Sequence, residues 1–235
     1  MQAIERPFAA RLAIIIDSAA KKAGAAVVEQ GQDVALDGVL PDLESDFMAI
    51  FMPAYTRTAK IFGDRLLDAF KSHDDFETKA EDYFSQAMQL WIRTTSAEKV
   101  TNVSKTTKKN IRAAIDEGFG AEMTGTQLAS HIVEKTGGEI AAIRASIIAR
   151  TETHMAAQHA TQEAAKSTQI PMKRIWIAAA DERTRTRHAA EDRDSHSAPV
   201  SMDEPFRVME LMYPGDPSGP AEEVINCRCV VAYVT

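Results

Sequence analysis

The character of this chain changes at residues 174–179, which read Arg174-Ile175-Trp176-Ile177-Ala178-Ala179. A short apolar run that is rich in β-branched and aromatic residues is typical of a buried strand. A second such run, rich in valine, covers residues 229–234, and five of the nine prolines lie between the two runs. This alternation of short strands and turn-forming residues predicts a compact, turn-rich α+β domain over residues 171–235.

The sequence that precedes this domain is helical in pattern. Apolar residues recur at steps of three and four over residues 8–28, 43–70 and 76–91, which predicts a helix in each segment. Residues 31–41 contain two glycines and end in a proline, which predicts a loop. Pro53 should kink or restart the second helix, because proline lacks the backbone N–H that a helix uses.

Three further helices are predicted between residues 104 and 170. Ser104 is the expected N-cap of the first, which should end at the glycines 118 and 120. Thr124 and Gln127 have the spacing of a capping box and should begin the second. The third carries four isoleucines on one face: Ile140, Ile143, Ile147 and Ile148. The predicted fold class is therefore α+β, with a mostly helical N-terminal portion followed by a small, turn-rich α+β C-terminal domain.

The composition is that of an ordinary globular protein, with 45% hydrophobic residues, 26% charged residues and a net charge of −7. It excludes intrinsic disorder, collagen and a disulfide scaffold. No apolar stretch approaches the ~18 residues of a membrane helix and no secretory signal is evident, so we expect no membrane partner and folding in a reducing cytosol. An acidic protein binds duplex DNA weakly because the phosphates repel it, so DNA contact should be secondary to protein contacts. One local basic stretch comprises Lys105, Lys108, Lys109 and Arg112.

The first candidate site follows the predicted strand at 174–179. Asp181, Arg183, Arg185 and His188 place an acid, two guanidinium groups and an imidazole close together in the sequence. These groups could form a charge-assisted hydrogen-bond network or an active site. The alternative is a solvated helix start with Asp181 as its N-cap. Composition alone favours this alternative, because Arg and Asp are usually surface residues.

The second candidate site involves the two cysteines, Cys227 and Cys229. A disulfide between such near neighbours would close a strained ring and stabilise little. In an extended segment both thiols point to one face, and with His188 they could bind zinc, the one cofactor that we consider. A fourth ligand would have to come from His196, an acidic residue or water, and buried thiols without a metal are the alternative. Neighbouring strands should bring His188 and the cysteines together.

The remaining motifs indicate structure rather than chemistry. Residues Tyr213-Pro214-Gly215-Asp216-Pro217 predict a type II turn, because glycine takes the positive-φ position after proline. His154 and His159 lack the four-residue spacing of a helical metal pair, and we interpret them as structural or surface residues. No phosphate-binding loop, nucleophile elbow or Walker lysine occurs in the sequence.

Short motifs also occur in a specific order over the second half of the chain. They are Ile148-Ala149-Arg150-Thr151-Glu152, Trp176, the group from Asp181 to His188, Asp203-Glu204-Pro205-Phe206, Tyr213-Pro214-Gly215-Asp216 and Asn226-Cys227-Arg228-Cys229. From about Ser104 onward, this set resembles the phage Mu F-like head morphogenesis (minor head) proteins. The implied motif network is Asp181, Arg183, Arg185, His188, Asp216 and Asn226. Members of that family read a short turn after the position of His188, whereas residues 190–200 here form a longer, polar segment.

The resemblance implies a structural role in a phage or prophage with double-stranded DNA. It implies a minor head protein that is not an enzyme, that associates with the portal vertex during assembly in the host cytoplasm, and that then belongs to the virion head. The portal and other capsid proteins are the implied partners. With this resemblance the chain divides into a helical region (1–103), a helical lead-in (104–170) and the compact domain (171–235). The apolar faces of residues 43–91 are candidate contact surfaces, unless they fill the protein's own core.

Two rival functions stand beside this one. A metal-dependent hydrolase or prophage toxin-like enzyme would use His188 and the pair Cys227 and Cys229, with Asp181 nearby. A plain DNA-binding module would depend on the basic stretch between Lys105 and Arg112.

Overall fold

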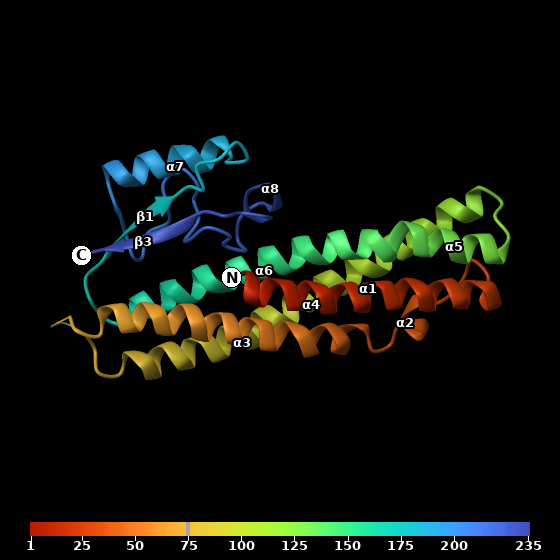
Figure 1. Ribbon diagram of the computed structural model, residues 1–235, viewed down its shortest axis with the longest axis horizontal. Helices are drawn as coiled ribbons and strands as arrows, with labels where there is room; N and C mark the ends of the chain where they lie inside the picture. Colours follow the sequence, from red (N-terminus) through yellow and green to blue (C-terminus); the bar gives the residue numbers. More distant parts are fainter. Residues whose placement is uncertain (74–75) are drawn as a thin grey trace. The chain divides into compact units, whose positions relative to one another are not determined.

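The chain folds into long helices followed by a small sheet (Figure 1). The computed structural model describes residues 1–73 and 76–235. The helices are α1 (Gln2–Gln30), α2 (Leu36–Val39), α3 (Leu43–Phe70), α4 (Ala80–Gly120), α5 (Gly125–Thr136), α6 (Gly138–Ser167), α7 (Thr186–Ser197) and α8 (Ala221–Val224). The strands are β1 (Lys173–Ile177), β2 (Val200–Ser201) and β3 (Val230–Val234). The predicted α+β fold class is confirmed, and both predicted strands are present.

The described residues form two compact units. One contains residues 2–54 and 93–149, and the other contains residues 55–92 and 150–235 together with Met1. All candidate site residues lie in the second unit. The domain boundary predicted between residues 103 and 104 falls within α4.

In the first unit, α1 packs against α5. Gly24 allows this close approach, because a Cβ atom there would lie 3.1 Å from the backbone oxygen of Ala129. Thr124 and Gln127 form the predicted capping box at the start of α5, which is confirmed. The start of α6 is held by Asp17, whose Oδ1 accepts a hydrogen bond from the N–H of Gly138 at 2.8 Å.

The segment predicted as a loop over residues 31–41 contains the short helix α2, so the loop prediction was wrong for residues 36–39. Side chains of α4 hold this segment in place. Arg112 donates to two of its carbonyl oxygens at 2.8 and 2.5 Å, and Lys108 pairs with Asp37 at 2.7 Å. Two cations of the predicted basic stretch therefore make contacts within the protein.

Neither the predicted restart at Pro53 nor the predicted helix start at Ser104 occurs in the described residues. The helix α3 runs through Pro53 without restarting, since a single proline removes only one backbone hydrogen bond. The helix α4 runs through Ser104, which is buried within it and is not an N-cap. No glycine or proline lies between Trp91 and Ile111, so nothing in the local sequence ends the helix there.

The buried face of α6 is built from alanine rather than isoleucine. Ala141, Ala145 and Ala149 are fully buried at four-residue spacing. We define the isoleucine stripe as Ile140, Ile143 and Ile147, which are 48%, 53% and 38% exposed. The apolar face that the sequence suggested for this helix is therefore largely open to solvent.

The apolar residues of segment 43–91 mostly fill the protein's own core. The buried members include Phe47, Phe51, Tyr55, Phe84 and Met88. The buried residues therefore stabilise the fold, as the alternative predicted, whereas Met52, Tyr83 and Leu90 of the same segment remain exposed.

The sheet of the second unit has the strand order β2-β1-β3 with antiparallel pairing throughout. Side chains from helices bind its backbone at both edges. The N–H of Trp176 in β1, beyond the end of β2, donates to Ser195 Oγ of α7 at 2.9 Å. The N–H of Val231 in β3 donates to Gln158 Oε1 of α6 at 3.3 Å.

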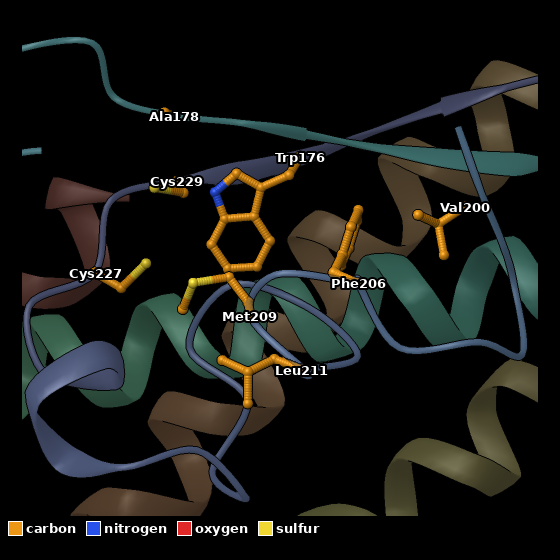
Figure 2. Close-up of a cluster of buried hydrophobic side chains, with 8 residues drawn as sticks. All are labelled: Trp176, Ala178, Val200, Phe206, Met209, Leu211, Cys227 and Cys229. Carbon is orange, nitrogen blue, oxygen red and sulfur yellow. The ribbon is translucent and has the colours of Figure 1, made fainter. Parts of the chain in front are cut away.

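Trp176 lies at the centre of the small core beside the sheet (Figure 2). Its indole ring meets the ring of Phe206 edge to face, with centroids 5.3 Å apart. The core contains Trp176, Ala178, Val200, Phe206, Met209, Leu211, Cys227 and Cys229. Both cysteine side chains therefore belong to the same packed cluster as the central tryptophan.

A buried arginine connects the sheet to the proline-rich loops. Arg174 of β1 is fully buried and donates to the carbonyl oxygen of Ser201 at 2.7 Å and to Gln162 Oε1 at 3.0 Å. It also donates to the backbone oxygens of Glu204 and Met212. Its guanidinium lies over the ring of Phe206, 5.0 Å from the centroid.

Candidate functional site

The structure brings His188, Cys227 and Cys229 together. His188 lies in the first turn of α7, and the two cysteines precede β3. Its Nδ1 is 3.2 Å from Sγ of Cys229 and 3.8 Å from Sγ of Cys227. One ligand atom from each residue lies within 4.8 Å of the others. The three side chains are only 2–3% exposed, so this thiol–imidazole cluster is closed to bulk solvent.

Glu223 of α8 completes the surroundings of the imidazole. Its Oε2 is 3.0 Å from Nε2 of His188, on the side of the ring opposite the sulfurs. Arg187 lies 3.5 Å from the other carboxylate oxygen. The ring of Trp176 stands edge-on to the imidazole, with centroids 5.4 Å apart and an interplanar angle of 89°. The imidazole is therefore held with one nitrogen toward the sulfurs and the other toward a carboxylate.

The two thiols have different proton affinities. Hydrogen bonds from Cys227 and His188 hold the pKa of the Cys229 thiol below its ordinary value. The thiol–thiol hydrogen bond and burial raise the pKa of Cys227. Cys229 is thus the more readily ionised sulfur, and a thiolate is the form that attacks electrophiles and binds metals.

Arg185 orders the chain that leads into the cysteines. Its guanidinium donates to the carbonyl oxygens of Glu223 and Ile225 at 3.3 and 2.7 Å. The backbone N–H of Asn226 donates to Thr151 Oγ1 of α6 at 3.1 Å, and Asn226 has a positive φ of 56°. These contacts fix the turn immediately before Cys227.

Asp181 is not the N-cap of α7, so the N-cap interpretation was wrong. The N-cap position belongs to Arg185, which makes no side-chain capping hydrogen bond. Asp181 instead accepts from the N–H of Arg183 at 3.0 Å and pairs with the guanidinium of Arg228. Arg183 itself is exposed. Asp181 stabilises a turn after β1 and the outer side of the Cys227–Cys229 segment.

Asp216 belongs to the predicted turn rather than to the thiol–imidazole cluster. Its N–H donates to the carbonyl oxygen of Tyr213 at 3.1 Å, and Gly215 has a φ of 82°, which confirms the turn. The carboxylate accepts from the N–H of Met212 and Ser218, both at 2.9 Å. Asp216 therefore has a structural role in the proline-rich loops.

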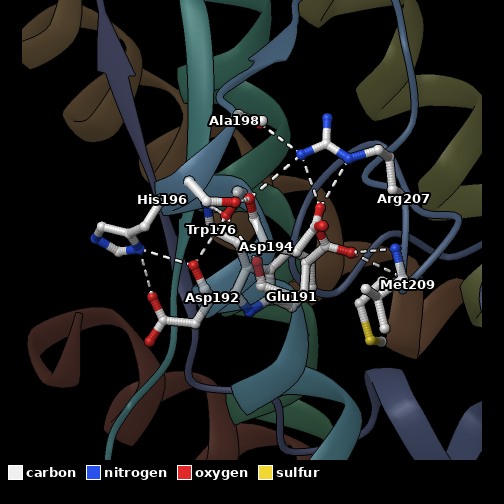
Figure 3. Close-up of polar contacts among 11 residues, drawn as sticks. Trp176, Glu191, Asp192, Asp194, His196, Ala198, Arg207 and Met209 are labelled. Atoms are coloured by element: carbon white, nitrogen blue, oxygen red, sulfur yellow. Dashed lines mark hydrogen bonds and ion pairs between the residues drawn. The ribbon is translucent and has the colours of Figure 1, made fainter.

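Sequence reasoning missed the acidic residues that anchor α7 (Figure 3). Glu191 is buried and accepts from the N–H of Val208 at 2.5 Å and of Met209 at 2.8 Å. His196, considered above as a fourth metal ligand, is exposed and pairs with Asp192 at 2.8 Å. It lies outside the thiol–imidazole cluster. The long polar segment after His188 is thus a helix that ties the loops to the sheet.

His154 and His159 of α6 are structural residues rather than surface residues, which is one of the two interpretations given above. His159 stacks on Trp91 with centroids 4.3 Å apart, and its Nδ1 lies 3.2 Å from the hydroxyl of Tyr213. Burial lowers the pKa of both His154 and His159 to about 4. Neither shares a ligand cluster with the cysteines among the described residues.

None of the helices in the described part of the chain is both long and apolar enough to cross a membrane.

Three comparisons with known proteins bear on this geometry. The family described as "Phage Mu protein F like protein" matches residues 105–232, a range that includes the thiol–imidazole cluster. The minor head protein GP7 of Bacillus phage SPP1 is 32% identical over 133 residues, which cover 53% of this chain and 40% of GP7. The chain thus spans about two fifths of the length of this relative. No solved structure matches the chain.

Proposed function

The chain belongs to the phage Mu protein F-like family, and on this premise we propose that it is a minor head protein in the morphogenesis of a phage or prophage head. The observation that carries the proposal is the family match over residues 105–232, from the second half of α4 to β3. The similarity to the minor head protein GP7 supports the same role. In this role the protein assembles in the host cytoplasm and then occupies the virion head.

The proposed partner is the portal, with other capsid proteins beside it. The isoleucine stripe of α6 supports a protein partner, because protein interfaces are anchored by apolar side chains that leave water on binding. Its three members follow one another at steps of three and four residues, so they form one continuous face of the helix. This stripe replaces the faces of residues 43–91 as the candidate contact surface.

DNA contact is secondary in this proposal. The net charge of −7 repels phosphates at long range. Lys108 and Arg112 of the basic stretch are engaged with Asp37 and with backbone carbonyls. A structural role is also favoured over the rival hydrolase. His188, Cys227 and Cys229 are buried, whereas a hydrolase must expose its reacting groups to substrate.

The test is co-expression with the portal protein of the same phage or prophage, followed by pull-down at increasing salt. We expect a complex that survives high salt, because apolar contacts are not screened. Ile143→Glu should weaken this complex at least tenfold. Ala142→Glu is the matched control, since it adds the same charge at the neighbouring exposed position of α6 and should leave binding unchanged.

Two results would overturn the proposal. One is the absence of portal binding together with tight, steeply salt-dependent binding to DNA. The other is turnover of a nucleic acid or peptide substrate that is lost in His188→Gln while the protein stays folded, which would favour the hydrolase.

A further inference from the structure

We propose that His188, Cys227 and Cys229 bind one zinc ion, through Nδ1 of the imidazole and the two thiolates. The proposal does not depend on the role in head assembly. It assigns to the thiol–imidazole cluster a stabilising function within the small C-terminal domain.

The distances between the ligand atoms suit this ion. Zinc bonds of about 2.3 Å to sulfur and 2.0–2.1 Å to nitrogen place neighbouring ligands about 3.6 Å apart at a tetrahedral angle. The two nitrogen–sulfur distances, 3.2 and 3.8 Å, lie on either side of this value. Both nitrogen–sulfur distances are therefore within a few tenths of an ångström of those in a tetrahedral zinc site.

Glu223 provides a second, independent indication. A histidine that binds zinc usually donates its other ring N–H to a carboxylate, which fixes the tautomer and the ring orientation. Glu223 Oε2 lies 3.0 Å from Nε2 of His188, while Nδ1 faces the sulfurs. With the proton on Nε2, the lone pair of Nδ1 points at the metal position. Glu223 is thus a positioning residue for the metal site.

The charge balance allows the site to be buried. A zinc ion with two thiolates and one neutral imidazole carries no net charge, so its burial costs far less than that of an isolated ion. Binding releases the protons of the two thiols. His196 is exposed and pairs with Asp192, so among the described residues the protein supplies these three ligands and His196 is not a fourth.

The backbone around the site is already ordered by contacts that need no metal. Arg185 binds the carbonyl oxygens of Glu223 and Ile225, and Thr151 accepts from the N–H of Asn226. Zinc would connect α7 with the segment before β3, two parts of a domain that has few strands and many prolines. Such a link adds stability where the core is small.

The first experiment measures metal in the full-length chain purified under reducing conditions without chelator. We expect about one zinc ion per chain by mass spectrometry. Replacement by cobalt(II) should produce a thiolate-to-cobalt charge-transfer absorption. His188→Gln and Cys229→Ser should abolish both signals. His196→Gln, which removes the exposed histidine of the same helix, should retain both signals.

The second experiment keeps the proposal testable if the ligand variants fail to fold. Competition against a chromophoric chelator gives the zinc affinity of the wild type and of Glu223→Gln, a variant that retains all three ligands. We expect the affinity to fall about 10- to 100-fold in the variant. In the wild type, a chelator should lower the thermal midpoint, and added zinc should restore it.

Three results would overturn the proposal. The first is a folded wild-type chain that contains no zinc, takes up none and keeps the same thermal midpoint with chelator. The second is a disulfide between Cys227 and Cys229 in the folded protein under reducing conditions. The third is an unchanged zinc affinity in all of the ligand variants.

Discussion

The guanidinium of Arg228 forms a two-point ion pair with the carboxylate of Asp181, with Nη2 and Oδ1 2.7 Å apart. Arg228 stands between the two cysteines in the sequence, so an extended backbone turns its side chain away from theirs. The pair holds the pKa of Asp181 well below its ordinary value and raises the pKa of Arg228. It joins the turn after β1 to the segment that enters β3.

Asp181→Asn should lower the thermal midpoint at neutral pH by removing this ion pair. Because folding depresses the pKa of Asp181, its contribution is present above the ordinary aspartate pKa of 3.8 and is lost as the pH falls below it. The difference between wild type and variant should therefore narrow below about pH 4 and also in high salt. Thermal unfolding at several pH values tests this. Glu182→Gln, at the exposed neighbouring position, should show no such dependence.

Arg174→Met should destabilise the protein strongly. The substitution keeps much of the side-chain volume but leaves the carbonyl oxygens of Ser201, Glu204 and Met212 without their donor. Each buried acceptor left unpaired costs about 1–3 kcal/mol, so we expect a loss of about 3–4 kcal/mol in urea unfolding. Lys173→Met, at the adjacent exposed position of β1, should change stability by less than about 0.5 kcal/mol. Equal losses in both variants would contradict the role given to Arg174.

Gly215→Ala should lower the free energy of unfolding for two reasons: the backbone conformation favours glycine, and the added methyl group would be crowded. Gly215 has a φ of 82°, and an added Cβ would lie 3.1 Å from Cδ2 of His154. We expect a loss of about 1–3 kcal/mol in urea unfolding. Gly38→Ala is the control, because no atom lies within 4 Å of the added Cβ and its φ is not positive. That variant should be neutral or more stable by up to about 1 kcal/mol.

The protein should lose stability between about pH 6.5 and pH 4 because His159 stays neutral when folded. Burial and the charge of Lys166 lower its pKa to about 4, against the opposing charge of Asp216. Below the ordinary value of 6.5 the unfolded chain takes up a proton that the folded chain does not, so the unfolding free energy falls with pH. His159 alone accounts for at most about 3 kcal/mol at pH 4. His154, whose pKa burial also lowers to about 4, adds to the loss over the same pH range.

His159→Gln tests this origin by urea unfolding across the same pH range. The variant should show a smaller slope of stability against pH, by up to about one proton. His196→Gln, which removes an exposed imidazole, should keep the wild-type slope. If His159→Gln kept the wild-type slope of stability against pH, the pH dependence would come from other groups and the prediction would be wrong.

Local sequence signals predicted those parts of the fold that depend on a few neighbouring residues. The capping box of Thr124 and Gln127, the turn at Gly215 and the strand around Trp176 are of this kind. Ser104 shows where such signals fail. Serine is a good N-cap residue by type, but no glycine or proline lies nearby and the helix continues through Ser104. The isoleucines of α6 show the same limit, since alanines allow closer packing and form the buried face.

Only the part of the candidate site whose residue types are characteristic of metal binding could be predicted from the sequence. Cysteine and histidine are the side chains that zinc prefers. The pair Cys227 and Cys229, together with His188, could therefore be identified as possible ligands from their residue types. Glu223 and Arg174 could not be identified in this way, because glutamate and arginine are usually surface residues. Their roles follow from burial beside His188 and within the sheet, which depends on contacts between distant segments. An arginine at the start of an apolar strand was the one available signal for Arg174.

The hydrogen bond between β3 and the side chain of Gln158 in α6 affects how the protein should behave at high concentration. The residues of β3, Val230-Val231-Ala232-Tyr233-Val234, combine high strand propensity with no charge. An open edge of this composition is a template for aggregation, because free backbone groups recruit strands from other molecules. Gln158 already occupies the outward N–H of Val231. A strand from another molecule must first displace Gln158 to pair at this position. Gln158 therefore disfavours aggregation of the protein through the edge of β3.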